Sequence, residues 1–298
     1  MIKIDNVEIM GWEHVIRGMR NPMNSWERAD SGICKGGDDG IGCENCANHD
    51  SCDHTYDHSW QLGKADHDLM MRLAAGGSTH AKYRRMIIVY ADITAPLYWW
   101  KEFDTYKVGT VANSCSTMHK IAAKEFTLND FSYEHLFGIY DRKGAENGLA
   151  LDVSPLHDKS ALFSPCGILR LTIQMLNTCR EKYLETKNKK YWWQMIQLLP
   201  SSYNQKRTVM LNYEVLAHIY KDRRNHKLDE WSEHPIIIDK LDIQSVGLTK
   251  DGFGVRGIVK ETKQEYFGFC DWIKTLPYSE IIVEERVKLY ADGKEVNL

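Results

Sequence analysis

The sequence predicts an α+β fold in which long helices pack on a small sheet, and three observations lead to this class. Apolar residues recur at intervals of three and four between Gly167 and Leu199, which is typical of helices that bury one face. The run MIIVYADI at 86–93 is β-branched and apolar, as in a strand buried on both faces. After Glu233 the chain becomes rich in β-prone runs separated by turn residues.

The first half of the chain predicts short elements around a polar insertion. A β-prone stretch opens the chain, followed by a helix over 12–19 and a loop over 21–32. Residues 32–58 contain many Gly, Asp, Asn, Cys and His and almost no aliphatic side chains, so this segment cannot bury a core of its own. Helices are expected over 65–77, where a Gly pair ends the pattern, and over 94–108.

The second half predicts longer helices and a β-rich end. Residues 113–120 are small and polar and are expected to form a loop or the end of a helix. Two helices should fill 167–199 before Pro200. A long helix is expected over 206–231. The remainder predicts strands, a helix around 265–276 and a hairpin at 287–298.

Composition and charge exclude several classes of protein. The 298 residues are 27% charged and 43% hydrophobic, as in a soluble globular enzyme. The net charge of −3 gives no overall field to attract nucleic acid or an anionic membrane, so we expect neither as a partner. No apolar run reaches the roughly 20 residues of a spanning helix. The opening MIKIDNVEIMGW lacks the regions of a signal peptide, so we expect a cytoplasmic location.

Four cysteines in the polar insertion have metal-ligand spacing. Cys34, Cys43, Cys46 and Cys52 form the pattern C-x8-C-x2-C-x5-C. Four thiolates complete a tetrahedral site, and a bound metal would order a segment that has no core. We expect one structural zinc ion here, with an iron–sulfur cluster or four free thiols as the alternatives.

Two blocks of the chain resemble the flavin-dependent thymidylate synthases. In that family a buried strand and an aromatic helix that begins at Ala-Pro lead to a signature R-H-R-x-x-S. Counting without gaps from Ala95–Pro96 puts Thr105, Tyr106 and Lys107 at the three basic positions and Thr110 at the serine. The serine beside the pyrimidine ring falls at Cys115 or, with a slip of one residue, at Ser116.

The second block matches the family at Leu199–Pro200, Asn212 and Arg223, again without a gap. The chain departs from the family in its charges. None of the three signature arginines remains, and only Lys107 keeps a charge. The third of them, which closes the signature, is replaced by Thr117 or, with the same slip, by Met118, and His119 is the nearest basic side chain.

The resemblance implies an enzyme that methylates dUMP reductively. FAD, methylenetetrahydrofolate and NADPH would be the cofactor and co-substrates, and the enzyme would be a homotetramer. It also implies a synthase-like domain over 1–231 that contains the insertion at 32–58, with a C-terminal extension over 232–298 packed on the same domain.

The same resemblance assigns site residues. Nucleotide contacts are expected from Arg223, Lys107, Thr110 and Asn113, and flavin contacts from Asn212, Tyr106 and His119. Cys115 and Ser116 are the candidate catalytic residues. A Cys115 thiolate could add to C6 of the pyrimidine, although an ordinary packed or exposed cysteine is the alternative. Tyr98, Trp99 and Trp100 are expected either to pack in the core or between subunits, or to stack on a flavin.

Two other functions remain open at this point. One is a related enzyme that hydroxymethylates dUMP or dCMP, for example for a virus that modifies its DNA. The other is a non-catalytic module in which the Cys-rich segment and aromatic surface bind nucleic acid or a protein.

Overall fold

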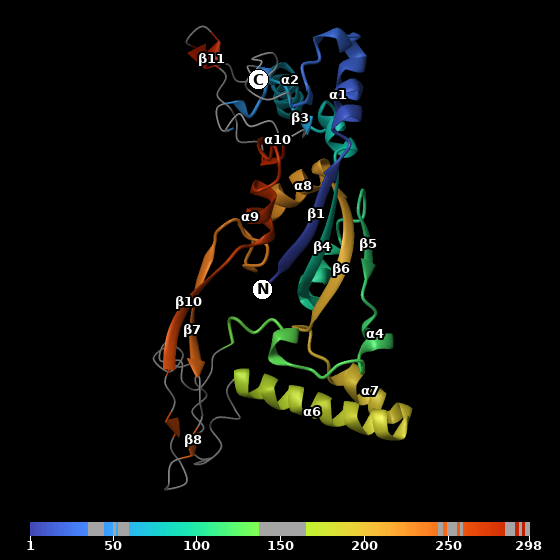
Figure 1. Ribbon diagram of the computed structural model, residues 1–298, viewed down its shortest axis with the longest axis vertical. Coiled ribbons are helices and arrows are strands. Elements are labelled where there is room, and N and C mark those ends of the chain that lie inside the picture. The colour runs from blue at the N-terminus through green and yellow to red at the C-terminus, as the bar shows by residue number, and fades with distance from the viewer. Residues whose placement is uncertain are drawn as a thin grey trace.

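The computed structural model describes residues 1–34, 45–49, 52, 60–136, 165–243, 247–248, 255–256, 259–283, 290–291 and 294–295. The predicted α+β class is confirmed by a four-stranded antiparallel sheet with helices around it. The strand order is β1 (Lys3–Met10), β4 (Ile88–Pro96), β6 (Asn204–Asn212) and β5 (Val111–Ser114). Figure 1 shows this sheet in the middle of an elongated molecule.

The longer helices lie at the two ends of the molecule and beside the sheet (Figure 1). They are α1 (Trp12–Arg20), α2 (Lys64–Ala75), α3 (Leu97–Phe103), α6 (Pro165–Thr186), α7 (Lys189–Leu198), α8 (Tyr213–Arg223) and α9 (Phe269–Lys274). Shorter helical turns are η1 (Asn21–Met23), η2 (Trp26–Arg28), η5 (Ala81–Met86), α4 (Thr117–Lys120), η6 (Leu128–Asp130) and α10 (Glu280–Val283). Among the described helices, none has both the length and the apolar character needed to cross a bilayer.

Four two-stranded ribbons complete the described structure. The longest pairs β7 (Ile236–Ile243) with β10 (Val259–Tyr266) and lies along one side of the molecule (Figure 1). The others pair β2 (Gly32–Ile33) with β3 (Trp60–Gln61), β8 (Gly247–Leu248) with β9 (Val255–Arg256), and β11 (Tyr290–Ala291) with β12 (Lys294–Glu295). Paired strands thus lie in the segment after Glu233 and at the position of the expected terminal hairpin.

Two sequence predictions are corrected by the sheet. The expected helix over 206–231 begins as strand β6 and becomes helix α8 only at Tyr213. The expected loop or helix end over 113–120 instead begins with the last residues of the edge strand β5, which pairs with β6 from Val111↔Met210 to Ser114↔Arg207. The short helix α4 follows it. In contrast, α2, α6 and α7 confirm the helices predicted from apolar spacing.

Strand β4 is buried on one face only, so the prediction of two buried faces is wrong. Val89, Ala91 and Ile93 are fully or almost fully buried, whereas Tyr90 is exposed and Asp92 is partly exposed. The alternation follows from the two-residue period of a strand, which sends successive side chains to opposite faces. The open face carries polar contacts between neighbouring strands.

Aromatic side chains fill the core beneath α3. Trp99 and Trp231 have no exposed surface, and their rings stack with centroids 4.4 Å apart. Phe269 of α9 contacts both rings, so this helix shares a core with α3. Trp100 is 1% exposed. The core interpretation of Trp99 and Trp100 is thus confirmed, and these two rings are closed to a ligand.

Asp92 gives the sheet a dependence on pH. Its carboxylate accepts hydrogen bonds from Thr208 Oγ1 (2.6 Å) and Asn6 Nδ2 (2.9 Å) and pairs with Lys206 Nζ (2.9 Å). The Thr208 bond, followed by the Lys206 and Asn6 bonds, holds the pKa of Asp92 well below its ordinary value. When the pKa of a carboxyl group is lower in the folded state than in the unfolded state, its ionised form stabilises the fold at a pH above the pKa of the unfolded state. This stabilisation is lost as the pH falls towards the pKa of the folded state.

We therefore expect the free energy of unfolding to decrease as the pH is lowered from about 5 to about 3, with a smaller decrease in Asp92→Asn. Urea titrations across this range measure the dependence. Asp222→Asn, at an exposed position on α8, serves as the control. An unchanged pH dependence in Asp92→Asn would contradict the role given to Asp92.

Candidate functional site

The two blocks identified in the sequence lie beside each other in the structure. Ala95–Pro96 pairs with Asn204–Gln205 across β4 and β6, and β5 pairs with the same strand on its other side. The backbone N–H of Cys115 donates to the carbonyl of Lys206 at 2.9 Å. Segments about 100 residues apart in sequence therefore lie side by side in one sheet.

Arg223 and Tyr106 meet at the C-terminal end of α8. The Arg223 Nε donates to the Tyr106 hydroxyl at 2.9 Å, and Nη1 contacts Glu102 Oε2 at 2.5 Å and His226 Nε2 at 2.7 Å. The guanidinium also lies 5.3 Å from the ring centroid of Trp231. Burial raises the pKa of Tyr106, and the Arg223 bond opposes this shift. Arg223 is thus held by its own chain while 19% of its side chain stays exposed.

Asn212 and Thr110 lie near the other end of α8. The Asn212 Oδ1 accepts from the N–H of Val215 at 3.0 Å and so caps the first turn of the helix. Gly109 adopts a φ of +80°, and a Cβ there would lie 2.7 Å from Asn212 Nδ2. The loop before β5 therefore packs closely on this cap, and the Thr110 hydroxyl donates to the carbonyl of Tyr106.

The candidate catalytic residues lie past the other end of β5. Cys115, Ser116 and His119 are exposed, and Ser116 Oγ caps α4 by accepting from the N–H of His119 at 3.1 Å. Gln205 Nε2 donates to the carbonyl of Cys115 and to Thr117 Oγ1, each at 3.1 Å, which fixes this turn. Gln205 is not among the residues predicted from the sequence.

The predicted residues therefore form two groups rather than one cluster. Arg223 with Tyr106, and Asn212 with the Gly109–Thr110 turn, lie along α8, whereas Cys115, Ser116 and His119 surround α4. Lys107 and Asn113 are exposed between the two groups, on the loop and on β5. Glu102 was also missed by the sequence argument, because its contact with Arg223 spans 121 positions.

The residues expected to contact a flavin do not form a cradle for one on the described chain. The side-chain oxygen of Asn212 is used by the helix cap, and this residue is 8% exposed. The Tyr106 hydroxyl is used by Arg223. His119 alone of the three presents an exposed side chain, and the flavin contacts of these residues stay a prediction.

The predicted zinc site is not supported. Among the described residues, no group of three or more His, Cys, Asp or Glu side chains is placed to hold a metal ion. Cys34, Cys46 and Cys52 therefore do not form three corners of one site, and Cys43 lies outside the described residues.

The cysteines differ sharply in their surroundings, which predicts different reactivity. Cys115 is exposed, whereas Cys270 has no exposed surface and burial raises its pKa to about 12, with Glu233 and Asp271 adding to the effect. Because the thiolate is the reactive form, iodoacetamide at pH 8 should label Cys115 in the folded protein and Cys270 only after unfolding. Peptide mass spectrometry measures both. Equal labelling rates in the folded protein would contradict this arrangement.

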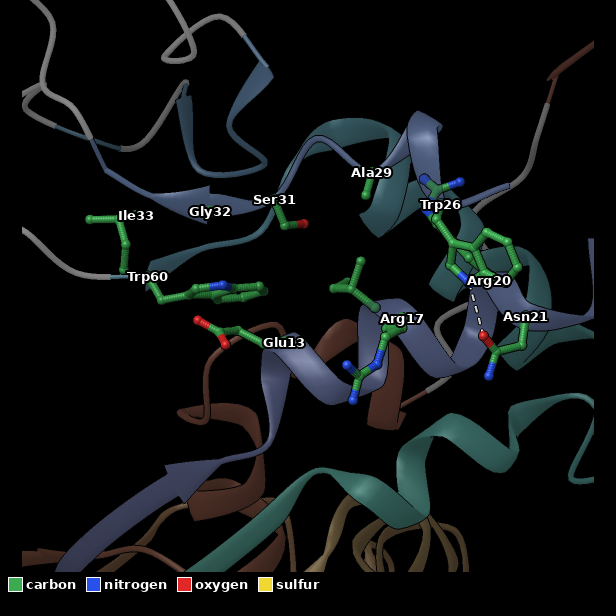
Figure 2. Close-up of a pocket in the computed structure, with 11 residues that line it drawn as sticks. Glu13, Arg17, Arg20, Asn21, Trp26, Ala29, Ser31, Gly32, Ile33 and Trp60 are labelled. Atoms are coloured by element: carbon green, nitrogen blue, oxygen red, sulfur yellow. Dashed lines mark hydrogen bonds between the residues drawn. The ribbon is translucent and has the colours of Figure 1, made fainter. Parts of the chain in front are cut away.

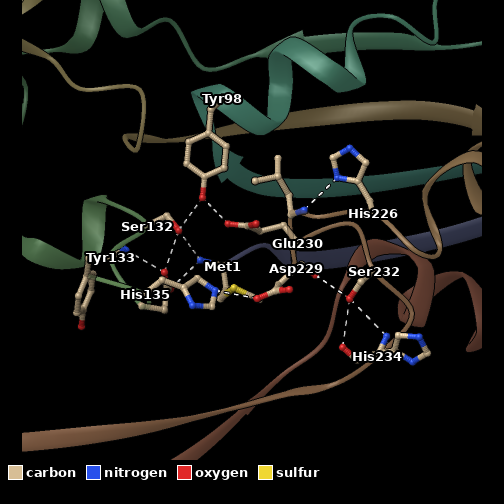
Figure 3. A network of polar contacts seen from close by, with 12 residues as sticks. Met1, Tyr98, Ser132, Tyr133, His135, His226, Asp229, Glu230, Ser232 and His234 are labelled. Carbon is tan, nitrogen blue, oxygen red and sulfur yellow. Dashed lines mark hydrogen bonds and ion pairs between the residues drawn. The ribbon is translucent and has the colours of Figure 1, made fainter. Parts of the chain in front are cut away.

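A second polar cluster joins α3 to the segment before Glu134 (Figure 3). The Tyr98 hydroxyl donates to Glu230, and it lies 3.2 Å from Ser132 Oγ. The amino group of Met1 pairs with Glu134 Oε1 at 2.7 Å. Burial, followed by the charge of Glu230, raises the pKa of Tyr98 far above its ordinary value. The cluster thus holds a neutral phenol and serves to fix these segments.

A scan against protein-family models finds no match, and no curated protein matches in sequence. Among solved structures, thymidylate synthase X (ThyX) from Helicobacter pylori, with FAD and dUMP, is 11% identical with a TM-score of 0.44, over 78% of this chain and 88% of that one. The UMP/dUMP methylase PolB from Streptomyces cacaoi, bound with 5-Br dUMP, is 11% identical with a TM-score of 0.42, over 77% and 79% of the two chains. These solved structures include the family that the two sequence blocks resemble.

Proposed function

We propose that this chain is an enzyme that modifies the pyrimidine ring of a deoxypyrimidine monophosphate, with dUMP as the substrate. The observation that carries the proposal is the adjacency of the two blocks that resemble the flavin-dependent thymidylate synthases. Residues 95–118 and 199–223 share strand pairing across β6, and Arg223 bonds Tyr106. This adjacency is what a site shared by the two blocks requires.

The proposed nucleotide surface runs from Arg223 along the loop to β5. Lys107 is exposed, and no ionic partner is found for it among the described residues, so its ammonium group can pair with a phosphate. Thr110 and Asn113 would offer a hydroxyl and an amide beside it. Arg223, neutralised in part by Glu102, would keep Tyr106 in place and lend its exposed edge to the nucleotide.

The proposed reaction replaces the hydrogen on C5 of the pyrimidine. In reductive methylation, methylenetetrahydrofolate would supply the carbon, and a flavin, once reduced by NADPH, would supply hydride. In hydroxymethylation, water takes the place of hydride and no flavin is needed. The poor fit of Asn212 and Tyr106 to a flavin supports keeping the second reaction as the alternative. The absorption spectrum of the purified protein separates them, since only the first requires flavin bands.

Isothermal titration with dUMP tests the proposed substrate. Saturable binding of dUMP or dCMP, with weaker binding of the matching nucleoside, supports the proposal because the phosphate is the proposed anchor. No binding of either nucleotide, together with affinity for single-stranded DNA, would instead favour a non-catalytic binding module.

The role of Cys115 is tested by turnover and not by binding. An active Cys115→Ala variant would discard Cys115 as a nucleophile.

We also propose a homo-oligomer, supported by an apolar stripe on α6. Ile168, Leu171 and Met175 are 50%, 45% and 49% exposed, and their spacing places them on one face of the helix. Exposed apolar stripes of this kind mark association surfaces. Leu171→Arg should shift the mass measured by light scattering towards that of a monomer, and Gln174→Arg, an exposed polar position on the same helix, should not. A monomeric unmodified protein would contradict the proposal.

A further inference from the structure

A cavity of about 560 Å³ lies between α1, the segment from Trp26 to Ile33, and Trp60 of β3. Its volume is within the range of small-molecule sites, roughly 300 to 1,000 Å³. It lies in the part of the chain next to the Cys-rich insertion and contains none of the residues of the proposed nucleotide surface.

Trp60 supplies a flat and firmly supported wall. Its indole stacks on Trp12, with ring centroids 5.7 Å apart and planes 17° from parallel. Trp12 in turn packs edge-on against Tyr213 and Tyr278, which ties the wall to the main core. One face of the Trp60 ring is thus covered by Trp12, and Figure 2 shows the ring lying along the cavity.

Apolar and aromatic side chains continue this lining. Ile16, Ala29 and Ile33 border the cavity, and Trp26 closes its far end with its Nε1 bonded to Asn21 Oδ1 at 2.9 Å. A ligand must therefore bring an apolar body as well as whatever polar group it carries. Ser31 cannot offer a free hydroxyl, because its Oγ already donates to Asp66 at 2.6 Å.

Three charged side chains line the cavity, and Glu13 is the one that lies beside the Trp60 ring. Figure 2 shows its carboxylate beside the indole and the Arg17 guanidinium directed away from it. Arg20 is 4% exposed and is neutralised by Asp66, whose Oδ1 lies 2.6 Å from its Nε. Glu13 and Arg17 are one helical turn apart, yet no ion pair joins them among the described contacts.

We propose that this cavity binds a small organic cation with an apolar or aromatic body, held by the Trp60 ring and the carboxylate of Glu13. The face of an indole attracts cations through its quadrupole, and a nearby carboxylate adds a direct charge contact. An anionic ligand would meet Glu13 at the same wall and is disfavoured. The proposal stands apart from the proposed function, since dUMP is an anion.

The probes are 3-(trimethylammonio)phenol and 3-tert-butylphenol, which have the same shape and differ by one positive charge. Calorimetric titration should show saturable binding of the cation, with the neutral phenol about tenfold weaker. Glu13→Gln should remove most of this preference by weakening the cation alone, because Glu13 is exposed and its loss leaves the fold intact. Trp60→Leu should weaken both probes, and Trp60→Phe should restore part of the cation affinity.

Glu27→Gln is the matched control, an exposed acid in η2 that does not line the cavity, and it should leave cation binding unchanged. The proposal is overturned if the two probes bind equally, if neither binds, or if Glu13→Gln binds the cation as the unmodified protein does. The Glu13→Gln variant should bind dUMP as the unmodified protein does. A negative result for the cation is therefore distinguishable from a negative result for the nucleotide.

Discussion

Replacing Asp66 with alanine is expected to lower the free energy of unfolding by about 3 to 5 kcal/mol, because it leaves a buried guanidinium unpaired. Asp66 has no exposed surface and binds Arg20 Nε through Oδ1 at 2.6 Å. Its Oδ2 accepts from the N–H groups of Asp30 and Ser31, each at 3.1 Å, and from the Ser31 hydroxyl at 2.6 Å. One carboxylate thus ties α1, α2 and the segment between them.

Urea-induced unfolding followed by circular dichroism measures this loss. Asp68→Ala is the matched control two positions away on α2, since Asp68 is exposed and only loosely paired with Arg72 at 3.6 Å. An exposed pair of this kind contributes about 0 to 1 kcal/mol. If both variants lost the same small amount, the carboxylate of Asp66 would not hold these segments together as described.

Replacing Arg223 with alanine is expected to weaken dUMP binding about 10-fold to 100-fold, as the loss of one or two charged hydrogen bonds would. The variant removes the donor to Tyr106 and leaves Glu102 without its 2.5 Å partner. Arg223→Lys should recover little, because an ammonium group cannot reproduce the guanidinium fork that bonds both groups. Calorimetric titration with dUMP measures the affinities.

Arg224→Ala is the control for this experiment, because Arg224 carries the same charge one position later but is exposed beside Tyr220. The dUMP affinity of this variant should stay within about threefold of that of the unmodified protein, since Arg224 contacts Tyr220 and none of the residues of the proposed nucleotide surface. Equal affinities in Arg223→Ala and the unmodified protein would remove Arg223 from the nucleotide surface.

Sequence patterns predicted the helices that bury one face against the core. Spacing of three and four at 65–77 and 167–199 reflects such burial, and α2, α6 and α7 form there. Strand β6 was missed because its short alternation runs without a break into the helical spacing of α8. Asn212 is the signal that separates them, since it ends the strand and caps the helix.

Edge strand β5 offers less for sequence analysis to detect. All four of its residues are exposed, so no apolar alternation marks it, and its pairing with β6 is what orders it. The partners of the site residues were hidden for a similar reason. The spacing of the blocks indicated that Tyr106 and Arg223 belong to one site, whereas the contacts of Arg223 with Glu102 and of Gln205 with Cys115 arise only when distant segments fold together.

The most direct test of the proposed function is release of tritium from dUMP labelled at C5. Methylation and hydroxymethylation both replace the C5 hydrogen, so either reaction transfers the label to water. With methylenetetrahydrofolate, NADPH and FAD supplied, we predict tritium release that falls when Arg223 is replaced by alanine. Retention of all the label in dUMP, and equally in dCMP labelled at the same carbon, would contradict the assignment of this chain as a pyrimidine-modifying enzyme.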